Sequence, residues 1–181
     1  MLRNKAVTIS KKLSYILRHN EDIDLDAEGW LDLKTAHKEL KKAKKLAEVT
    51  VDDILEVSEK FDKKRFEIKG NKIRAKYGHS IEQKIVYDPA EPPESLYHGT
   101  ATELTATILE DGLKKMGRQY VHLTHELDTA HSVGKRHSRK VVIFTIQAKK
   151  ASDTGLEFYY SDGTWLVDNV PAEFIGEILY V

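Results

Sequence analysis

The chain has 181 residues, no cysteine, and 29 acidic against 29 basic residues. The lack of cysteine excludes disulfide bonds and thiolate metal ligands, and no apolar run is long enough to span a bilayer, so we expect a cytoplasmic protein. The charge is uneven, because residues 1–80 carry 19 Lys and Arg against 14 Asp and Glu. A basic first half would attract a polyanion, although lysine runs such as residues 41–45 are also typical of solvated helix faces.

Three helices are predicted in the first half of the chain. Ser10 is a candidate N-cap for a helix whose apolar residues follow the helical spacing and which ends near residues 18–20. A second helix is expected over residues 34–45. Thr50 is expected to cap a third helix, which has Phe61 among the residues of its apolar face.

A hairpin is predicted directly after these helices. Residues 65–69 and 72–76 alternate between apolar and polar side chains on either side of Gly70-Asn71, which is a strong signal for a two-residue turn. Three helices followed by a hairpin are the outline of a winged-helix lobe. This module is common in DNA-binding proteins, so a pure binding function has to be considered.

Residues 88–95 contain three of the four prolines and are predicted to link a first lobe, 1–87, to a second lobe, 96–181. In the second lobe, one helix is expected from Thr102 to Gly112 and a shorter one from about Glu126. The strands expected there are residues 96–98, 121–123, 141–148, 156–160, 164–167 and 174–181. Because these elements do not alternate regularly, the predicted class is α+β with mainly antiparallel sheet.

Several common catalytic devices are absent from the sequence. It contains no Gly-x-Gly-x-x-Gly, no P-loop and no serine-centred nucleophile elbow. His122, His125 and His131 could suggest a metal, but the spacing is non-specific without cysteines or a His-Glu-x-x-His helix, so no metal site is predicted.

A few positions could carry chemistry without those devices. Arg18 and His19 close the first helix, where cations also interact favourably with the helix dipole by about 0.3–1 kcal/mol. Arg65 opens the hairpin and is expected to face outward. Arg118 precedes a short strand, in a loop of the kind that often presents binding groups. His98-Gly99-Thr100 lies at a strand end, where a glycine allows close approach of a ligand.

Taken together and in this order, these motifs resemble the RNA 2′-phosphotransferase family (Tpt1/KptA) over nearly the whole chain. The matching pieces are residues 13–19, 29–30, 64–66, 73–80, 97–100, 112–113, 116–118, 121–123, 165–166 and 170–171. The sequence departs from the family pattern at Tyr77, where glutamine is expected, and at Tyr120, where histidine is expected. Residues 162–165 read Asp-Gly-Thr-Trp where Asn-Gly-Val-Trp is more usual.

The resemblance implies an enzyme that removes an internal 2′-phosphate from RNA with NAD as co-substrate. The 2′-phosphate would attack the nicotinamide ribose, expel nicotinamide and leave an ADP-ribosylated RNA phosphate. The ribose 2″-hydroxyl would then attack that phosphate, which frees 2′-hydroxyl RNA and ADP-ribose 1″,2″-cyclic phosphate. The implied fold is a winged-helix lobe joined to an ADP-ribosyltransferase-like lobe with a split antiparallel sheet. We expect a monomer, and a substrate of the kind that tRNA splicing generates in some organisms.

The resemblance also assigns roles. Arg18, Arg65 and Arg118 would bind the 2′-phosphate, since a guanidinium grips phosphate oxygens bidentately and keeps its charge. His19 would manage the proton of the 2″-hydroxyl. The implied NAD contacts are His98, Gly99, Thr100, Leu113, Met116, Ser132, Gly134 and Arg136. Further RNA contacts are implied for Arg74, His79 and Ser80.

Two alternatives remain open at this point. The chain could be an NAD-dependent ADP-ribosyltransferase that stops after the first step and caps a terminal phosphate of a nucleic acid. It could also be a winged-helix DNA-binding regulator whose second lobe senses a ligand. Product identity separates the two enzymes, and a regulator would bind duplex DNA and leave NAD intact.

Overall fold

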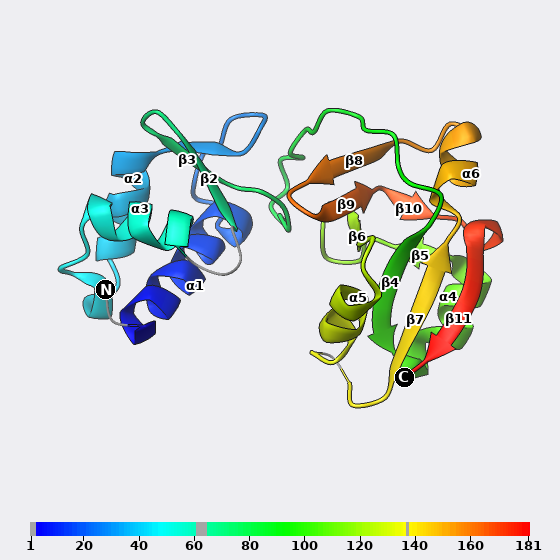
Figure 1. Cartoon of the computed structure of the whole chain (residues 1–181). Helices are drawn as coiled ribbons and strands as arrows, with labels where there is room; N and C mark the ends of the chain where they lie inside the picture. The colour runs from blue at the N-terminus through cyan, green and yellow to red at the C-terminus, as the bar shows by residue number, and fades with distance from the viewer. Residues whose placement is uncertain (1–2, 61–64, 137) are drawn as a thin grey trace. The chain divides into compact units, whose positions relative to one another are not determined.

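The computed structural model describes residues 3–60, 65–136 and 138–181, and the chain divides into two compact units at Val86/Tyr87 (Figure 1). Both units mix helices with antiparallel strands. The predicted linker, residues 88–95, falls at the start of the second unit, where the N–H of Ala90 donates to the carbonyl of Phe158 at 2.8 Å. Among the described residues, none of the helices has the length and apolar character needed to cross a membrane.

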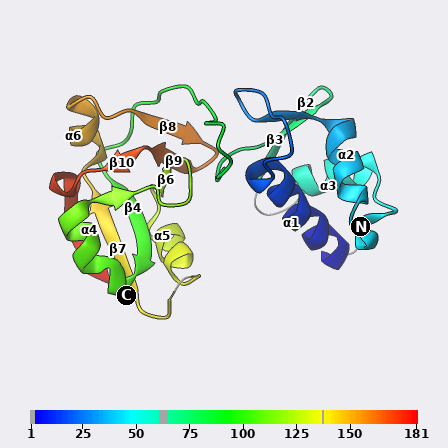
Figure 2. The ribbon, with the colours of Figure 1, turned by 180° about the vertical axis from the view of Figure 1, so that it is seen from behind.

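The first unit contains the three helices and the hairpin that the sequence predicts. Its elements are α1 (Arg3–His19), β1 (Trp30–Asp32), α2 (Leu33–Lys41), η1 (Lys44–Leu46), α3 (Val51–Lys60), β2 (Phe66–Lys69) and β3 (Lys72–Ala75). α1 packs against both α2 and α3, and the strands form an antiparallel sheet in the order β1-β3-β2 (Figure 1 and Figure 2). Gly70 has a φ of +60° in the predicted turn, a conformation that glycine adopts without strain.

The ends of two helices differ from the prediction. Ser10 caps nothing, because α1 begins at Arg3 and Ser10 is buried in its middle, where Ala6 and Ile9 extend the apolar stripe toward the N-terminus. α2 ends at Lys41, four residues before its predicted end. The cap of α3 is confirmed.

That cap is reciprocal. The N–H of Asp53 donates to Oγ1 of Thr50 at 3.2 Å, and the N–H of Thr50 donates to the Asp53 carboxylate at 3.0 Å. The prediction for Phe61 falls outside the described residues.

The second unit holds eight strands and three helices among its described residues, with two short 3₁₀ turns. They are β4 (Leu96–Ala101), η2 (Thr102–Leu104), α4 (Thr105–Asp111), β5 (Leu113–Lys114), β6 (Val121–Leu123), α5 (Leu127–Gly134), β7 (Val141–Ile146), α6 (Ala148–Asp153), β8 (Phe158–Ser161), β9 (Thr164–Val167), β10 (Asn169–Val170), η3 (Ala172–Phe174) and β11 (Ile175–Tyr180). They form antiparallel sheets in the orders β11-β7-β4, β6-β9-β8 and β10-β5. The predicted strands 121–123 and 164–167 are confirmed to the residue, whereas β7 ends at Ile146 because α6 begins at Ala148.

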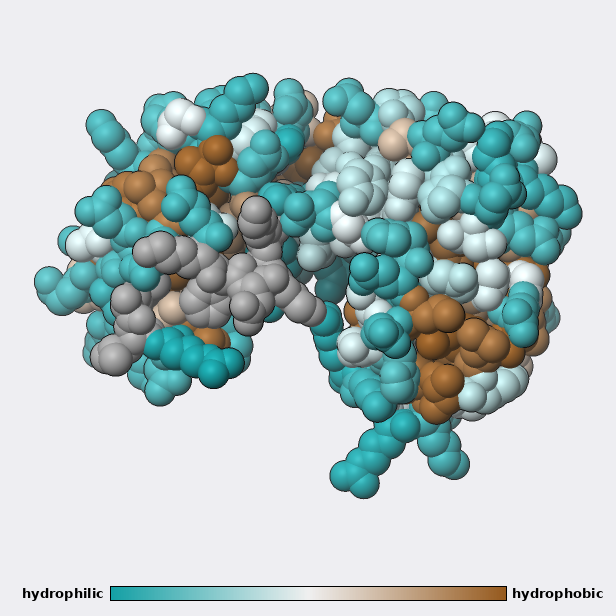
Figure 3. Space-filling model, viewed as in Figure 1, coloured by the Kyte–Doolittle hydropathy of each residue, from teal (hydrophilic) through white to brown (hydrophobic). Residues whose placement is uncertain are grey.

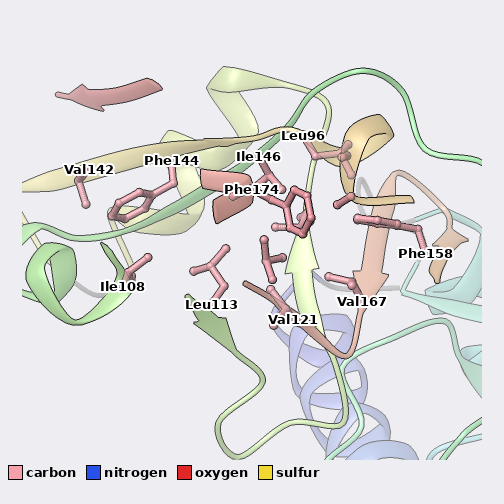
Figure 4. Packing of buried hydrophobic residues seen from close by; sticks show 14 residues of the cluster. Leu96, Ile108, Leu113, Val121, Val142, Phe144, Ile146, Phe158, Val167 and Phe174 are labelled. Atoms are coloured by element: carbon pink, nitrogen blue, oxygen red, sulfur yellow. The ribbon is translucent and has the colours of Figure 1, made fainter. Parts of the chain in front are cut away.

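The two faces of β7 bury different partners. Val142, Phe144 and Ile146 point into the main core with Ile108 of α4, as Figure 4 shows. The alternate residues, Val141 and Ile143, contact Ala130 of α5. The two helices therefore cover opposite faces of the β11-β7-β4 sheet, which follows from the two-residue period of a strand. The visible face of the second unit is largely hydrophilic, with apolar atoms reaching the surface over β7 and β11 (Figure 3).

Candidate active site

Arg18 and His19 form the C-terminal end of α1 and are held by Ser80, which lies 61 or more residues away in the sequence. The backbone N–H of Ser80 donates to the carbonyl of Arg18 at 2.9 Å. The Ser80 hydroxyl lies 2.8 Å from Nδ1 of His19. The chain after β3 thus returns to the last turn of α1 and fixes both the backbone and the imidazole of the predicted pair.

The Arg18 side chain is half-buried, and its Nε and Nη2 atoms lie out of contact with solvent. Its guanidinium carbon is 5.5 Å from the centre of the Tyr77 ring, within the range of a cation–π contact. Tyr77 is one of the departures from the family pattern, so in this chain an aromatic ring supports the arginine.

Arg65 was expected to face outward from the hairpin, but its half-buried side chain reaches α1. Its Nη1 donates to Oγ of the buried Ser10 at 2.9 Å, and its carbonyl accepts from the N–H of Lys76 at 3.1 Å. Ser10, Ser14 and Arg18 recur every four residues and therefore line one face of the helix. Arg18 and His19 therefore lie together at the end of α1, whereas Arg65 contacts this helix eight residues earlier, at Ser10, and the predicted joint role of the three stays a prediction.

His79 is a buried neighbour of this group, with 2% of its surface exposed. Burial, and to a lesser extent the charges of Arg18, His19 and Arg74, lower its pKa from 6.5 to about 4. The ring is therefore neutral near pH 7. So little exposed surface favours a packing role beside Arg18, and the predicted RNA contact of His79 stays a prediction.

Arg74 is engaged within the first unit. Its guanidinium lies 4.4 Å from the centre of the Trp30 ring and forms ion pairs with Glu67 at 2.7 Å and Glu28 at 3.4 Å. These contacts tie β3 to β1 and β2, since Trp30 and Glu67 flank Arg74 in the sheet register. A structural role accounts for Arg74, and its predicted RNA contact is not tested by these contacts.

In the second unit, His98 is half-buried on β4 and its ring orientation is fixed. Nδ1 lies 3.0 Å from the backbone carbonyl of His122. Because a carbonyl can only accept, Nδ1 carries the proton, and in the neutral ring Nε2 is an acceptor. The adjacent Thr100 is 7% exposed.

Gly99 and Gly134 are required by the packing of α5 on β4. A Cβ at Gly99 would lie 1.9 Å from the carbonyl oxygen of Ala130, and one at Gly134 would lie 2.5 Å from Cγ1 of Val141. No side chain fits at either place. Close backbone packing therefore explains both glycines, and their predicted NAD contacts stay predictions.

The remaining predicted residues of the second unit differ in exposure. Leu113 is 3% exposed and belongs to the main core (Figure 4), whereas Met116 is 84% exposed and has a φ of +53°. Arg118 is exposed in the turn that follows, where its N–H donates to the carbonyl of Lys115. Ser132 and Arg136 are exposed on and just after α5.

Sequence reasoning missed the supporting roles of Ser10 and Tyr77 and one aromatic cluster. Ser10 was assigned to a cap, although its spacing of eight residues from Arg18 could have placed it on the same helix face. Tyr87, Tyr120 and Tyr159 pack with ring centres 5.5–6.5 Å apart. Burial, together with the nearby Glu157, raises the pKa of Tyr159 to about 12.

His19 is held by the Ser80 hydroxyl, Arg65 by the Ser10 hydroxyl and Arg18 by the Tyr77 ring, and cations held in this way are typical of proteins that bind phosphate. Comparison with known proteins narrows this class. Residues 4–169 match the family described as RNA 2′-phosphotransferase, Tpt1 / KptA family, and the chain belongs to this family.

Three relatives in other organisms are each named probable RNA 2′-phosphotransferase. The protein of Acetivibrio thermocellus is 44% identical over 92% of this chain and 94% of its own length. That of Bacillus thuringiensis subsp. konkukian is 42% identical over 93% of both chains. That of Hahella chejuensis is 41% identical over 95% of this chain and 94% of its own.

Proposed function

We propose that the protein is an NAD-dependent RNA 2′-phosphotransferase. It removes an internal 2′-phosphate through an ADP-ribosylated RNA 2′-phosphate and yields 2′-hydroxyl RNA, nicotinamide and ADP-ribose 1″,2″-cyclic phosphate. The observation that supports this best is the anchoring of Arg18 and His19 at the exposed end of α1, by the Tyr77 ring and the Ser80 hydroxyl. We further propose a cytoplasmic monomer that acts on RNA of the kind produced in tRNA splicing.

The proposed chemistry needs cations around the RNA 2′-phosphate, which first attacks the nicotinamide ribose and is then attacked by the ribose 2″-hydroxyl. Arg18 supplies one of them from the end of α1 and Arg65 a second from the start of the hairpin, and Tyr77 and Ser10 hold their side chains in place. Arg118 is the third proposed cation. His19 is proposed to hold or move the proton of the 2″-hydroxyl, because Ser80 anchors Nδ1 and thereby directs Nε2 away from Ser80.

The second unit offers a partial fit to NAD. His98 has a fixed tautomer and could accept from a ribose hydroxyl through Nε2, and exposed Ser132 and Arg136 could meet the phosphates. Leu113 is committed to the core, so exposed Met116 is the better candidate for an apolar wall. When bound, NAD supplies the ribose carbon that accepts the RNA phosphate.

We also propose a fold type for each of the two lobes. The first, residues 1–87, would be a winged-helix lobe, which is supported by the helix order and the hairpin. The second, residues 96–181, would be an ADP-ribosyltransferase-like lobe with a split sheet, joined by the linker 88–95. The separate sheets β11-β7-β4 and β6-β9-β8 agree with this proposal.

The test is incubation with an oligoribonucleotide that carries one internal 2′-phosphate, with and without NAD, followed by resolution of all products. We expect 2′-hydroxyl RNA and ADP-ribose cyclic phosphate only when NAD is present. A persistent ADP-ribosylated RNA would instead identify the enzyme that stops after the first step. Intact NAD and unchanged RNA would refute both enzymes.

A further inference from the structure

A groove in the first unit lies between α1 and the segment that follows α2. It has a volume of about 440 Å³. The residues that line it are Thr8, Lys11, Lys12, Tyr15, Ala43, Lys44, Lys45 and Leu46. Every charged residue in this lining is a lysine, so positive charge surrounds a groove whose own surface is mostly apolar.

Tyr15 presents an aromatic surface in this groove. The side chain is 48% exposed, and Nζ of Lys12 lies 4.8 Å from the centre of its ring. An exposed ring among lysines combines a stacking platform with phosphate-binding charges, the pairing by which proteins hold single-stranded nucleic acid. An acidic peptide would use the lysines and leave the ring without a stacking partner.

The lysines of the groove keep their charge available. Among the described residues, Lys11, Lys12, Lys44 and Lys45 form no ion pair, whereas the neighbouring Lys42 pairs with Glu39 at 2.7 Å. A solvated helix face would explain the lysines alone. It would not explain an exposed tyrosine and a groove at the same place.

The groove and the proposed proton carrier His19 lie on the same stripe of α1. Thr8, Lys12, Tyr15 and His19 are spaced by three or four residues and lie along one stripe of α1. Tyr15 is one helical turn before His19, a rise of about 6 Å at 1.5 Å per residue. Nucleotides next to the one that carries the 2′-phosphate could therefore follow α1 from His19 toward Thr8.

We propose that this groove binds the single-stranded RNA that flanks the 2′-phosphorylated nucleotide. One base stacks on Tyr15, and the neighbouring phosphates contact Lys11, Lys12, Lys44 and Lys45. This inference rests on the proposed function, because it assigns a second subsite to the same RNA substrate.

The test compares two RNAs with the same internal 2′-phosphate, one of about ten nucleotides and one trinucleotide, by affinity measured without NAD so that no turnover occurs. Wild-type protein should bind the longer RNA about tenfold more tightly. Lys44→Gln combined with Lys45→Gln should abolish most of that advantage and reduce the salt slope of log affinity by about 1.4, at about 0.7 per single-strand phosphate. Tyr15→Ala should also weaken the longer RNA by about tenfold.

The matched control is Lys34→Gln combined with Lys38→Gln, which removes the same charge from exposed positions of α2. This control should keep the wild-type length preference. The proposal for the groove would be refuted if wild-type protein bound both RNAs with equal affinity, or if the control lost as much of the length preference as the groove variant. Neither result would contradict the proposed function. Poly-glutamate serves as the probe for an acidic peptide. If the groove variant lost affinity for poly-glutamate but kept its affinity for RNA, the proposal of an RNA-binding groove would also be refuted. Failure of wild-type protein to act on either RNA with NAD would refute the function itself.

Discussion

Acidification should destabilise the first unit through His79, because folding holds this ring neutral. Its pKa is lowered from 6.5 to about 4, mainly by burial. Between these two values the unfolded chain binds a proton that the folded chain does not, so the stability present above pH 6.5 is lost as the pH falls toward 4. For this one group the loss between about pH 7.5 and about pH 5 is about 2 kcal/mol.

The assay is urea unfolding at those two pH values. Trp165 is replaced by Phe, so that the fluorescence of Trp30 reports on the first unit, and the same protein with His79→Gln serves as reference. The reference should lose about 2 kcal/mol less on acidification than the protein with His79, whatever other histidines contribute to both. Equal losses, or a His79 ring that titrates near 6.5 by NMR, would refute the burial argument.

Three further predictions concern activity and packing. His19→Ala should release nicotinamide but accumulate ADP-ribosylated RNA in a single-turnover assay, and full rates for both steps would contradict the role of His19. Ser10→Ala removes the hydroxyl that accepts from Arg65, so it should slow 2′-phosphate removal several-fold and lower the free energy of unfolding by about 1 kcal/mol. Unchanged turnover would show that Arg65 needs no anchor. Gly99→Ala places Cβ against the Ala130 carbonyl and should cost about 1–3 kcal/mol in thermal unfolding, while Gly117→Ala, which has open space, should cost far less.

Short sequence patterns predicted the turns and helix caps that depend only on neighbouring residues. The Gly70-Asn71 turn located both strands of the hairpin, and Thr50 with Asp53 located the start of α3. The start of α1 was wrong because serine favours a cap in isolation. In the structure, Ser10 is surrounded by apolar residues of the same helix and accepts from Arg65, 55 residues away. A contact over that distance in sequence leaves no local pattern.

In the candidate site, too, the sequence predicted some residues but not the long-range contacts that orient them. The end of an amphipathic helix predicted where Arg18 and His19 would lie, and the resemblance supplied Arg65. The contacts that orient them depend on the return of the chain after β3, which brings Tyr77 and Ser80 to α1. Arg74 and His79 looked equally suited to RNA in the sequence, since neither the stacking of Arg74 on Trp30 nor the burial of His79 has a signature in residue type.

The different sides of helix α1 have different roles. Consecutive residues are about 100° apart around its axis and therefore face different surroundings. Leu13 and Leu17 face the core and hold the helix in place. The face with Ser10 and Arg18 contacts Arg65 of the hairpin, and the stripe with Tyr15 and His19 runs from the groove to the proposed proton carrier. Substitutions one position apart on α1 should therefore affect different properties: Leu17 stability, Arg18 phosphate binding, and His19 the second chemical step.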